Sequence, residues 1–139
     1  MGLMTGKRGL IMGLANDKSI AWGIARALHD EGTELALTYV GDAFKKRVLP
    51  LAEQLGVTQT MDCDVGDEAS IDACFDQLKD AWGSIDFVVH AIGYSDKEQL
   101  RGRYVETTRD NFNMSMDISV YSFTAVMQRA EKLMTNGGS

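Results

Sequence analysis

The sequence has few of the residues that build disulfide frameworks, metal sites or disordered segments. Its 139 residues include two cysteines, two histidines and a single proline, Pro50. The spacing of Cys63 and Cys74 fits neither a zinc knuckle nor a redox motif, so two reduced thiols are expected. His29 and His90 have no acidic partner at ligand spacing. No metal site is therefore predicted.

Basic residues and long apolar runs are also scarce. There are 14 lysines and arginines against 20 acidic residues, with a formal net charge of −6 and a pI near 4.8. A nucleic-acid-binding surface needs a positive stripe, so no nucleic-acid partner is expected. No apolar run is long enough to cross a bilayer, and the first residues lack the apolar core of a signal peptide. We expect a soluble, cytoplasmic protein with no membrane partner.

Short apolar runs alternate with amphipathic stretches of helical length, which is typical of βαβ units around a parallel sheet. Strands are predicted at residues 8–12, 35–39, 58–61 and 87–89, and helices at 20–31, 43–55, 68–82 and 108–134, with a polar connection at 95–106. Right-handed crossovers place the strands in the order 3-2-1-4. The fourth strand then lies at an unprotected edge, so we expect a doubly wound α/β domain, truncated after this strand and its following helix.

The first predicted strand runs directly into Gly13, and Ser19 precedes the first helix. A glycine here lets the backbone turn tightly and approach a pyrophosphate, which the amides and dipole of the next helix attract. The segment is not the ordinary G-x-G-x-x-G fingerprint, because Ser19 occupies a glycine position. Ser19 is a good N-cap, and its hydroxyl could also donate to a phosphate oxygen. A plain turn at Gly13 and a plain cap at Ser19 are the alternative.

Two further signals follow the third and fourth predicted strands. Asp64 follows the third, and a carboxylate beside a free amide complements the amino group and ring nitrogen of adenine. Asp64 could equally be a loop residue or the cap of the helix at 68–82. Residues 90–93 read His-Ala-Ile-Gly, and small residues there let a ribose cross the edge of the sheet. All these signals lie around the point where the strand order reverses and ligands bind.

Together these segments resemble the bacterial enoyl-[acyl-carrier-protein] reductases, a divergent branch of the short-chain dehydrogenase/reductase family. The similarity rests on Gly13-Leu-Ala-x-x-x-Ser-Ile-Ala-Trp-Gly-Ile-Ala, Asp64-Val65, residues 90–93 and residues 117–123. It implies a Rossmann-type, three-layer α/β/α fold, with residues 1–139 as a single, partial dinucleotide-binding domain. It also implies a homotetramer that transfers hydride from NADH to the trans-2 double bond of an enoyl thioester on acyl carrier protein, in fatty-acid biosynthesis.

The resemblance also assigns roles to individual residues. Those expected to bind the cofactor are Gly13, Ala15, Ser19 and Ile20 at the pyrophosphate and its ribose, Asp64 and Val65 at adenine, and Ile92 and Gly93 at the nicotinamide-side ribose. Those expected near the acyl chain are Gly93, Tyr94, Ser95 and Leu100. A valine at Gly13 is expected to fill the pyrophosphate space and leave the fold intact.

Cofactor preference follows from the end of the second predicted strand. Many NADH-using members of the family have glutamine where this chain has Val40, which puts one contact to the adenosine ribose in doubt. Neither Val40 nor Gly41 is basic, however, and a 2′-phosphate needs a basic partner there. NADH is therefore expected over NADPH.

The family's chemistry uses a tyrosine and a lysine seven positions later, the tyrosine stabilising the enolate that hydride transfer creates. Of the tyrosines in this chain, only Tyr39 has a lysine, Lys46, at that offset, and the pair lies on the adenosine side. We expect ordinary packing of Tyr39 and a solvated Lys46, and assign no catalytic residue. Two alternatives stay open: another short-chain reductase acting on a carbonyl, and a non-catalytic nucleotide-binding module.

Overall fold

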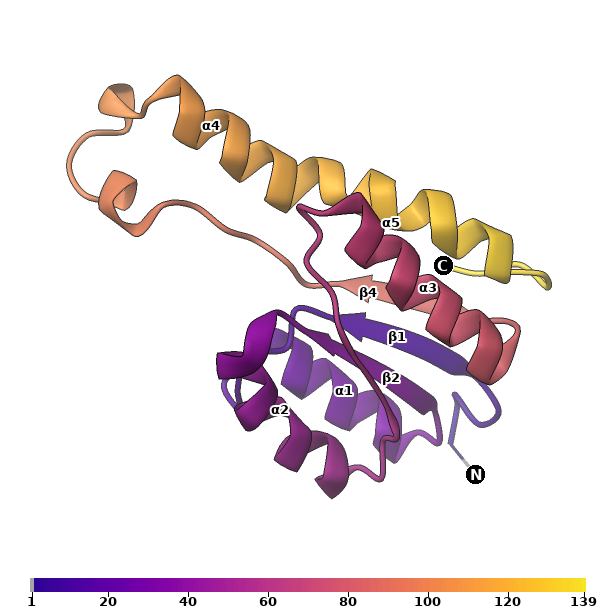
Figure 1. The fold of residues 1–139 in the computed structure, drawn as a ribbon. Coiled ribbons are helices and arrows are strands. Elements are labelled where there is room, and N and C mark those ends of the chain that lie inside the picture. The colour runs from indigo at the N-terminus through magenta and orange to yellow at the C-terminus, as the bar shows by residue number, and fades with distance from the viewer. Residues whose placement is uncertain (1) are drawn as a thin grey trace.

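The computed structural model describes residues 2–139 and contains a four-stranded parallel sheet (Figure 1). Its strands are β1 (Arg8–Met12), β2 (Glu34–Tyr39), β3 (Gln59–Asp62) and β4 (Phe87–His90). They lie in the order β3-β2-β1-β4, which confirms the predicted order. The central strands β1 and β2 are apolar and almost completely buried, because helices cover both faces of a parallel sheet.

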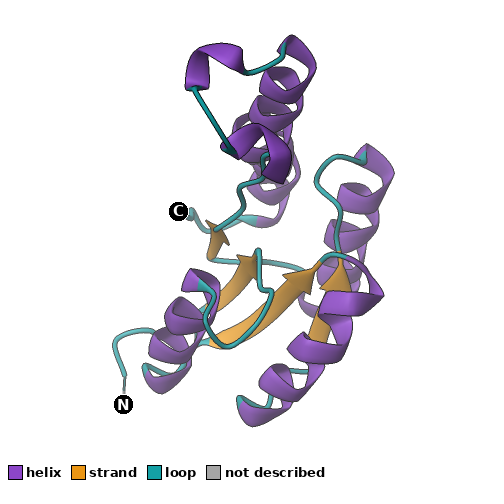
Figure 2. Cartoon of the chain, turned by 90° about the vertical axis from the view of Figure 1, so that its left-hand side faces the viewer, coloured by secondary structure: helices purple, strands orange, loops and turns teal. Residues whose placement is uncertain are grey.

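Two helices pack on each face of the sheet (Figure 2). On one face lie α1 (Ile20–Asp30) and α2 (Gly41–Gln54), and on the other lie α3 (Glu68–Trp82) and α5 (Ser122–Ala130). The alternation of side chains along β1 divides the core between the faces: Ile11 points to the α1 side and Leu10 to the α3 side. The predicted three-layer α/β/α arrangement is therefore confirmed.

The N-cap of α3, the helix that follows β3, is Asp67 and not Asp64. Asp67 precedes α3, and its carboxylate accepts a hydrogen bond from the backbone N–H of Ala69 at 3.0 Å. The helix ends at Gly83, which has a φ of +75°. The interpretation of Asp64 as the helix cap is wrong, because Asp67 already occupies the N-cap.

The last predicted helix is one rod built from different turns (Figure 1). It consists of α4 (Arg109–Met116), the π turn η3 (Asp117–Tyr121), α5 and the short 3-10 helix η4 (Glu131–Leu133). The connection before it contains two further 3-10 turns, η1 (Lys97–Leu100) and η2 (Tyr104–Glu106). A single α-helix over 108–134 was expected; the structure replaces one stretch of it with the wider π turn, a local geometry that is frequent at functional sites.

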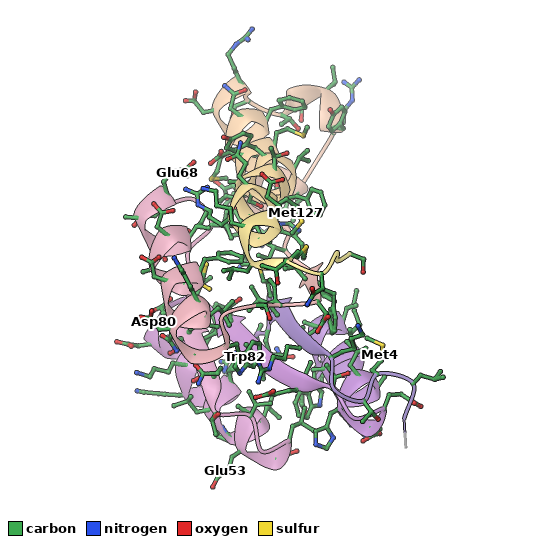
Figure 3. All side chains as sticks on the ribbon, turned by 90° about the vertical axis from the view of Figure 1, so that its right-hand side faces the viewer. Met4, Glu53, Glu68, Asp80, Trp82 and Met127 are labelled. Carbon is green, nitrogen blue, oxygen red and sulfur yellow. The ribbon has the colours of Figure 1, made fainter. Side chains whose placement is uncertain are left out.

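Arg129 fastens α5 to α3, and Figure 3 shows these helices side by side with Glu68 at the start of α3. Its guanidinium contacts Asp72 Oδ1 at 2.8 Å, pairs with Glu68 and donates to the carbonyl of Ala125 at 2.8 Å. Only 16% of the Arg129 side chain is exposed. The Asp72 and Glu68 carboxylates raise the pKa of Arg129 above its usual value, so the guanidinium stays protonated.

The outer edge of β4 is not entirely unpaired, contrary to expectation. The N–H of Ser139 donates to the carbonyl of Asp86 at 3.1 Å, and the N–H of Val88 donates to the carbonyl of Ser139 at 3.0 Å. Within residues 2–139, no named strand pairs with this edge. None of the described helices combines the length and apolar character needed to cross a bilayer.

Candidate dinucleotide-binding site

The carboxyl ends of the four strands open into one cleft of about 410 Å³. Its walls come from the carboxyl end of each strand: residues 13–15 after β1, 38–40 at the end of β2, 63–65 after β3 and 91–94 after β4, with Phe44 and Ile118 completing it. In the parallel order β3-β2-β1-β4 the strand order reverses beside β1, between β1 and β4, and doubly wound sheets bind ligands at this point. A larger hollow of about 670 Å³ beside the outer edge of β4 lies away from these strand ends.

Gly13 is required where β1 leaves the sheet. Its φ is +88°, and a Cβ added to it would lie 2.1 Å from the carbonyl oxygen of Ala91 and 2.7 Å from the carbonyl carbon. The end of β1 therefore touches the backbone that follows β4, and only glycine permits that approach. The expectation that a valine here would leave the fold intact is wrong, because its side chain would collide with the backbone of Ala91.

Ser19 precedes α1 but does not cap it with its side chain. Its hydroxyl oxygen instead accepts hydrogen bonds from the N–H groups of Ala15, at 3.1 Å, and Asn16, at 3.0 Å. Ser19 is the N-cap residue of α1, as predicted, but its side chain does not bond to the helix, because the loop between β1 and α1 folds back and supplies the donors. Within residues 2–139 its hydroxyl proton has no acceptor, and it is available for a ligand oxygen.

The start of α1 has the properties of an anion site. The N–H groups of Ile20 and Ala21 have no acceptor in the part of the chain that the structure describes. The helix dipole adds partial positive charge at this end, which favours a phosphate group. The Ile20 side chain is 80% exposed and leaves the helix start open to solvent.

Asp64 and Val65 form the wall of the cleft after β3. The Asp64 carboxylate accepts a hydrogen bond from the N–H of Gly66 at 2.9 Å, and its own N–H donates to Ser70 Oγ at 2.9 Å. The other carboxylate oxygen and the N–H of Val65 have no partner within residues 2–139. An acceptor beside a donor is the pattern that the amino group and a ring nitrogen of adenine need.

The Asp62 carboxylate lies next to the end of β2, a position that was not predicted from the sequence. The Asp62 carboxylate accepts a hydrogen bond from the N–H of Gly41 at 3.0 Å, immediately after Val40. Dinucleotide folds bind the adenosine ribose at the end of the second strand, often with an acidic residue. The parallel register that places Tyr39 beside Asp62 was the signal that could have located this carboxylate.

Beyond β4 the chain forms the opposite wall of the cleft through Ile92, Gly93 and Tyr94. Ser119, on the π turn, accepts a hydrogen bond from the N–H of Tyr94 at 3.0 Å and donates one to its carbonyl at 3.2 Å. Ser119 belongs to the segment 117–123 that carries the family resemblance, but its contact with Tyr94 was not predicted, because the two residues are 25 positions apart.

Two of the residues predicted to bind the acyl chain lie elsewhere. Ser95 and Leu100 line a separate hollow of about 400 Å³, between the connection at 95–106 and α4. Asn111 holds the connection there: its amide oxygen accepts from the N–H of Asp96 at 3.0 Å, and its amide nitrogen donates to Ser95 Oγ at 3.3 Å. The structure thus groups Gly93 and Tyr94 with the cofactor residues, and Ser95 and Leu100 apart from them.

The only tyrosine–lysine pair with the expected spacing is part of the scaffold. The Tyr39 side chain is buried in the core on the α1 side, whereas Lys46 is exposed on α2. Among residues 2–139, no cluster of three or more His, Cys, Asp or Glu could hold a metal ion. Cys63 and Cys74 are both buried as free thiols, and the side-chain hydrogen bond with Cys63, together with burial, raises the pKa of the Cys74 thiol.

Comparison with known proteins agrees with this geometry. The enoyl-[acyl-carrier-protein] reductase [NADH] 1 of Rhizobium meliloti (strain 1021) is 63% identical over 138 residues, or 99% of this chain and 51% of that protein. The enzyme of Anaplasma phagocytophilum, solved in complex with NAD, is 59% identical, with a TM-score of 0.95 over 99% of this chain and 52% of that one.

A second solved structure, the Bacillus cereus enzyme with NADP+ and indole naphthyridinone, is 41% identical, with a TM-score of 0.96 over 99% of this chain and 55% of that one. The chain spans about half the length of the curated relatives it matches. A family model described as Enoyl-(Acyl carrier protein) reductase matches residues 13–139. The resemblance found in the sequence is confirmed, and the chain belongs to the enoyl-[acyl-carrier-protein] reductase family.

Proposed function

We propose that this chain forms the NADH-binding part of an enzyme that reduces the trans-2 double bond of enoyl-acyl-carrier-protein thioesters in fatty-acid biosynthesis. The observation that carries the proposal is the cleft of about 410 Å³, where the ends of all four strands meet beside the open start of α1. Such a cleft suits an elongated ligand with an anionic centre and two cyclic ends.

Each part of the cleft suits one part of a dinucleotide. The pyrophosphate is expected at the N–H groups of Ile20 and Ala21, with the Ser19 hydroxyl donating to one of its oxygens. Adenine would donate from its amino group to the Asp64 carboxylate and accept from the N–H of Val65. The nicotinamide-side ribose would lie against Ile92 and Gly93 at the end of β4, on the far side of β1. When bound, the cofactor supplies the hydride.

NADH is the favoured form of the cofactor. The Asp62 carboxylate, held at the N–H of Gly41, places negative charge where the adenosine ribose is expected. A 2′-phosphate would be repelled there, and neither Val40 nor Gly41 offers a basic side chain to offset the repulsion.

The enolate-stabilising pair of the family has no counterpart in this cleft. Tyr94 lies at the nicotinamide side, but Arg101 stands at the lysine offset, and Tyr39 is buried at the adenosine side. We therefore expect residues 1–139 alone to bind NADH without reducing a crotonyl thioester.

The other partners of the whole protein are acyl carrier protein, which presents the thioester, and further copies in a homotetramer. Exposed apolar side chains recur along one side of the α4–α5 rod and support self-association: Phe112 (47% exposed), Met116 (43%), Val120 (53%) and Phe123 (51%). Their spacing of three or four residues places them on one helical stripe, which water solvates poorly.

The test is to titrate the chain with NADH, following nicotinamide fluorescence, and to displace the ligand with ADP. We expect saturable binding that ADP reverses and that Asp64→Ala weakens. Binding without competition by ADP, or without dependence on Asp64, would contradict the adenine site. Catalysis is tested separately, by assaying crotonyl-thioester reduction by the whole protein; NADH binding without turnover there would favour a nucleotide-binding module.

A further inference from the structure

One hydroxyl group holds the part of the cleft that follows β4. Ser119 Oγ accepts from the N–H of Tyr94 at 3.0 Å and donates to the carbonyl of Tyr94 at 3.2 Å. A serine hydroxyl has one proton, and these two bonds use it together with one lone pair. The segment of residues 91–96 has no regular secondary structure. β4 pairs with β1 only as far as His90, so the backbone of Tyr94 has no strand partner. The Ser119 hydroxyl takes up its N–H and its carbonyl instead.

The π turn that carries Ser119 is itself anchored at the sheet. Ser122 donates to the carbonyl of Ile118 at 2.6 Å, and the His90 ring contacts Ser122 Oγ at 2.8 Å. Ile118, next to Ser119, lines the cleft. Ser122, which contacts His90, and Ser119, which holds Tyr94, are only three residues apart. A shift of the α4–α5 rod would therefore move Tyr94 with it.

We propose that Ser119 is a positioning residue that fixes Gly93 and Tyr94 for the nicotinamide half of the dinucleotide. The inference rests on the proposed function, since it needs a dinucleotide in this cleft. A loop already held in its bound conformation costs less entropy to order when the ligand arrives. Ser119 lies on the π turn beside the end of β4, whereas Asp64 and Val65 follow β3 at the opposite edge of the sheet. Losing its hydroxyl should therefore affect only one end of the ligand.

The experiment compares Ser119→Ala and Ser119→Thr with the parent chain by titration with NADH and, separately, with ADP. Ser119→Ala is expected to weaken NADH binding about tenfold, the effect of losing two hydrogen bonds of ordinary net strength. ADP binding should stay within about twofold, because ADP lacks the nicotinamide half. Ser119→Thr retains the hydroxyl and should restore NADH binding. A general structural defect would weaken both ligands alike.

Two further measurements keep the result unambiguous. Ser115→Ala removes a neighbouring hydroxyl that is buried and has no partner within residues 2–139, and it should leave NADH binding unchanged. Hydrogen exchange at the Tyr94 amide should be faster in Ser119→Ala than in the parent, without any ligand. Equal NADH affinity or equal Tyr94 exchange in Ser119→Ala and the parent would overturn the inference alone. A parent that binds ADP but not NADH would overturn the proposed function and this inference with it.

Discussion

His90 and Ser122 are joined by a hydrogen bond of 2.8 Å between the imidazole Nε2 and the hydroxyl Oγ, which fastens the end of β4 to the start of α5. Ser122 commits its own proton to the carbonyl of Ile118, so His90 must be the donor and carry its proton on Nε2. The ring also meets Phe123 edge-on, with centroids 5.7 Å apart. The bond thus sets the tautomer of a half-buried histidine beside the cleft.

The first prediction concerns pH. Burial lowers the pKa of His90 below its usual value of about 6.5. Between the folded-state pKa and about 6.5, the unfolded chain binds more protons than the folded chain, so the free energy of unfolding should fall as the pH drops through this window. His90→Gln can still donate a hydrogen bond but does not titrate. Urea unfolding at several pH values from 7.5 to 5.5 should show a smaller decline for this variant; parallel curves would contradict the prediction.

The second prediction separates two glycines near α1. Gly13→Ala should lower the free energy of unfolding by at least about 2 kcal/mol, because a Cβ there meets the Ala91 backbone at 2.1 Å and the φ of +88° is unfavourable for alanine. Gly23→Ala, in the middle of α1, meets nothing within 4 Å and should raise it by up to about 1 kcal/mol. Both values come from urea denaturation, and a neutral effect at Gly13 would refute the proposed contact with Ala91.

The third prediction concerns the form of the cofactor. The parent should bind NADH more tightly than NADPH, because the Asp62 carboxylate beside Gly41 repels a 2′-phosphate. Asp62→Asn keeps the acceptor for the Gly41 N–H and removes the charge, so it should narrow the ratio of the two dissociation constants roughly threefold to tenfold. Asp42→Asn, a charge removal at the start of α2, is the matched control. A parent that prefers NADPH would contradict the prediction.

The fourth prediction tests the loop between β1 and α1. Ser19→Ala leaves the N–H groups of Ala15 and Asn16 without their acceptor and removes the donor expected at the pyrophosphate. ADP affinity should fall about tenfold, whereas adenosine, which has no phosphate, should bind nearly as before. Ser19→Thr keeps the hydroxyl and serves as the control. Calorimetric titration would decide it, with an equal loss for both ligands counting against this role.

Much of the fold follows from local signals. Apolar runs, helical periodicity and right-handed crossovers predict the strand order β3-β2-β1-β4. They therefore also predict that Gly13, Asp64 and Gly93 all lie at the carboxyl ends of the strands. The predicted bounds of α3, residues 68–82, agree with the structure at both ends: Gly83 is a strong local signal for its end, whereas its N-cap, Asp67, was not predicted. Family membership could also be found, since the segments that carry it are continuous in sequence.

Only the tertiary structure decided which partners the residues at the carboxyl ends of the strands have. From the sequence, the Ser19 hydroxyl could bond either to the start of α1 or to the loop before it. In the structure it accepts from the loop, because the loop folds back over it. The contacts of Gly13 with Ala91, of Asp62 with Gly41 and of Ser119 with Tyr94 each join segments from different elements. The periodicity of the sequence determined where each helix and strand lies along the chain. These contacts depend instead on how the ends of the packed elements are oriented relative to one another, and no local sequence pattern encodes this orientation.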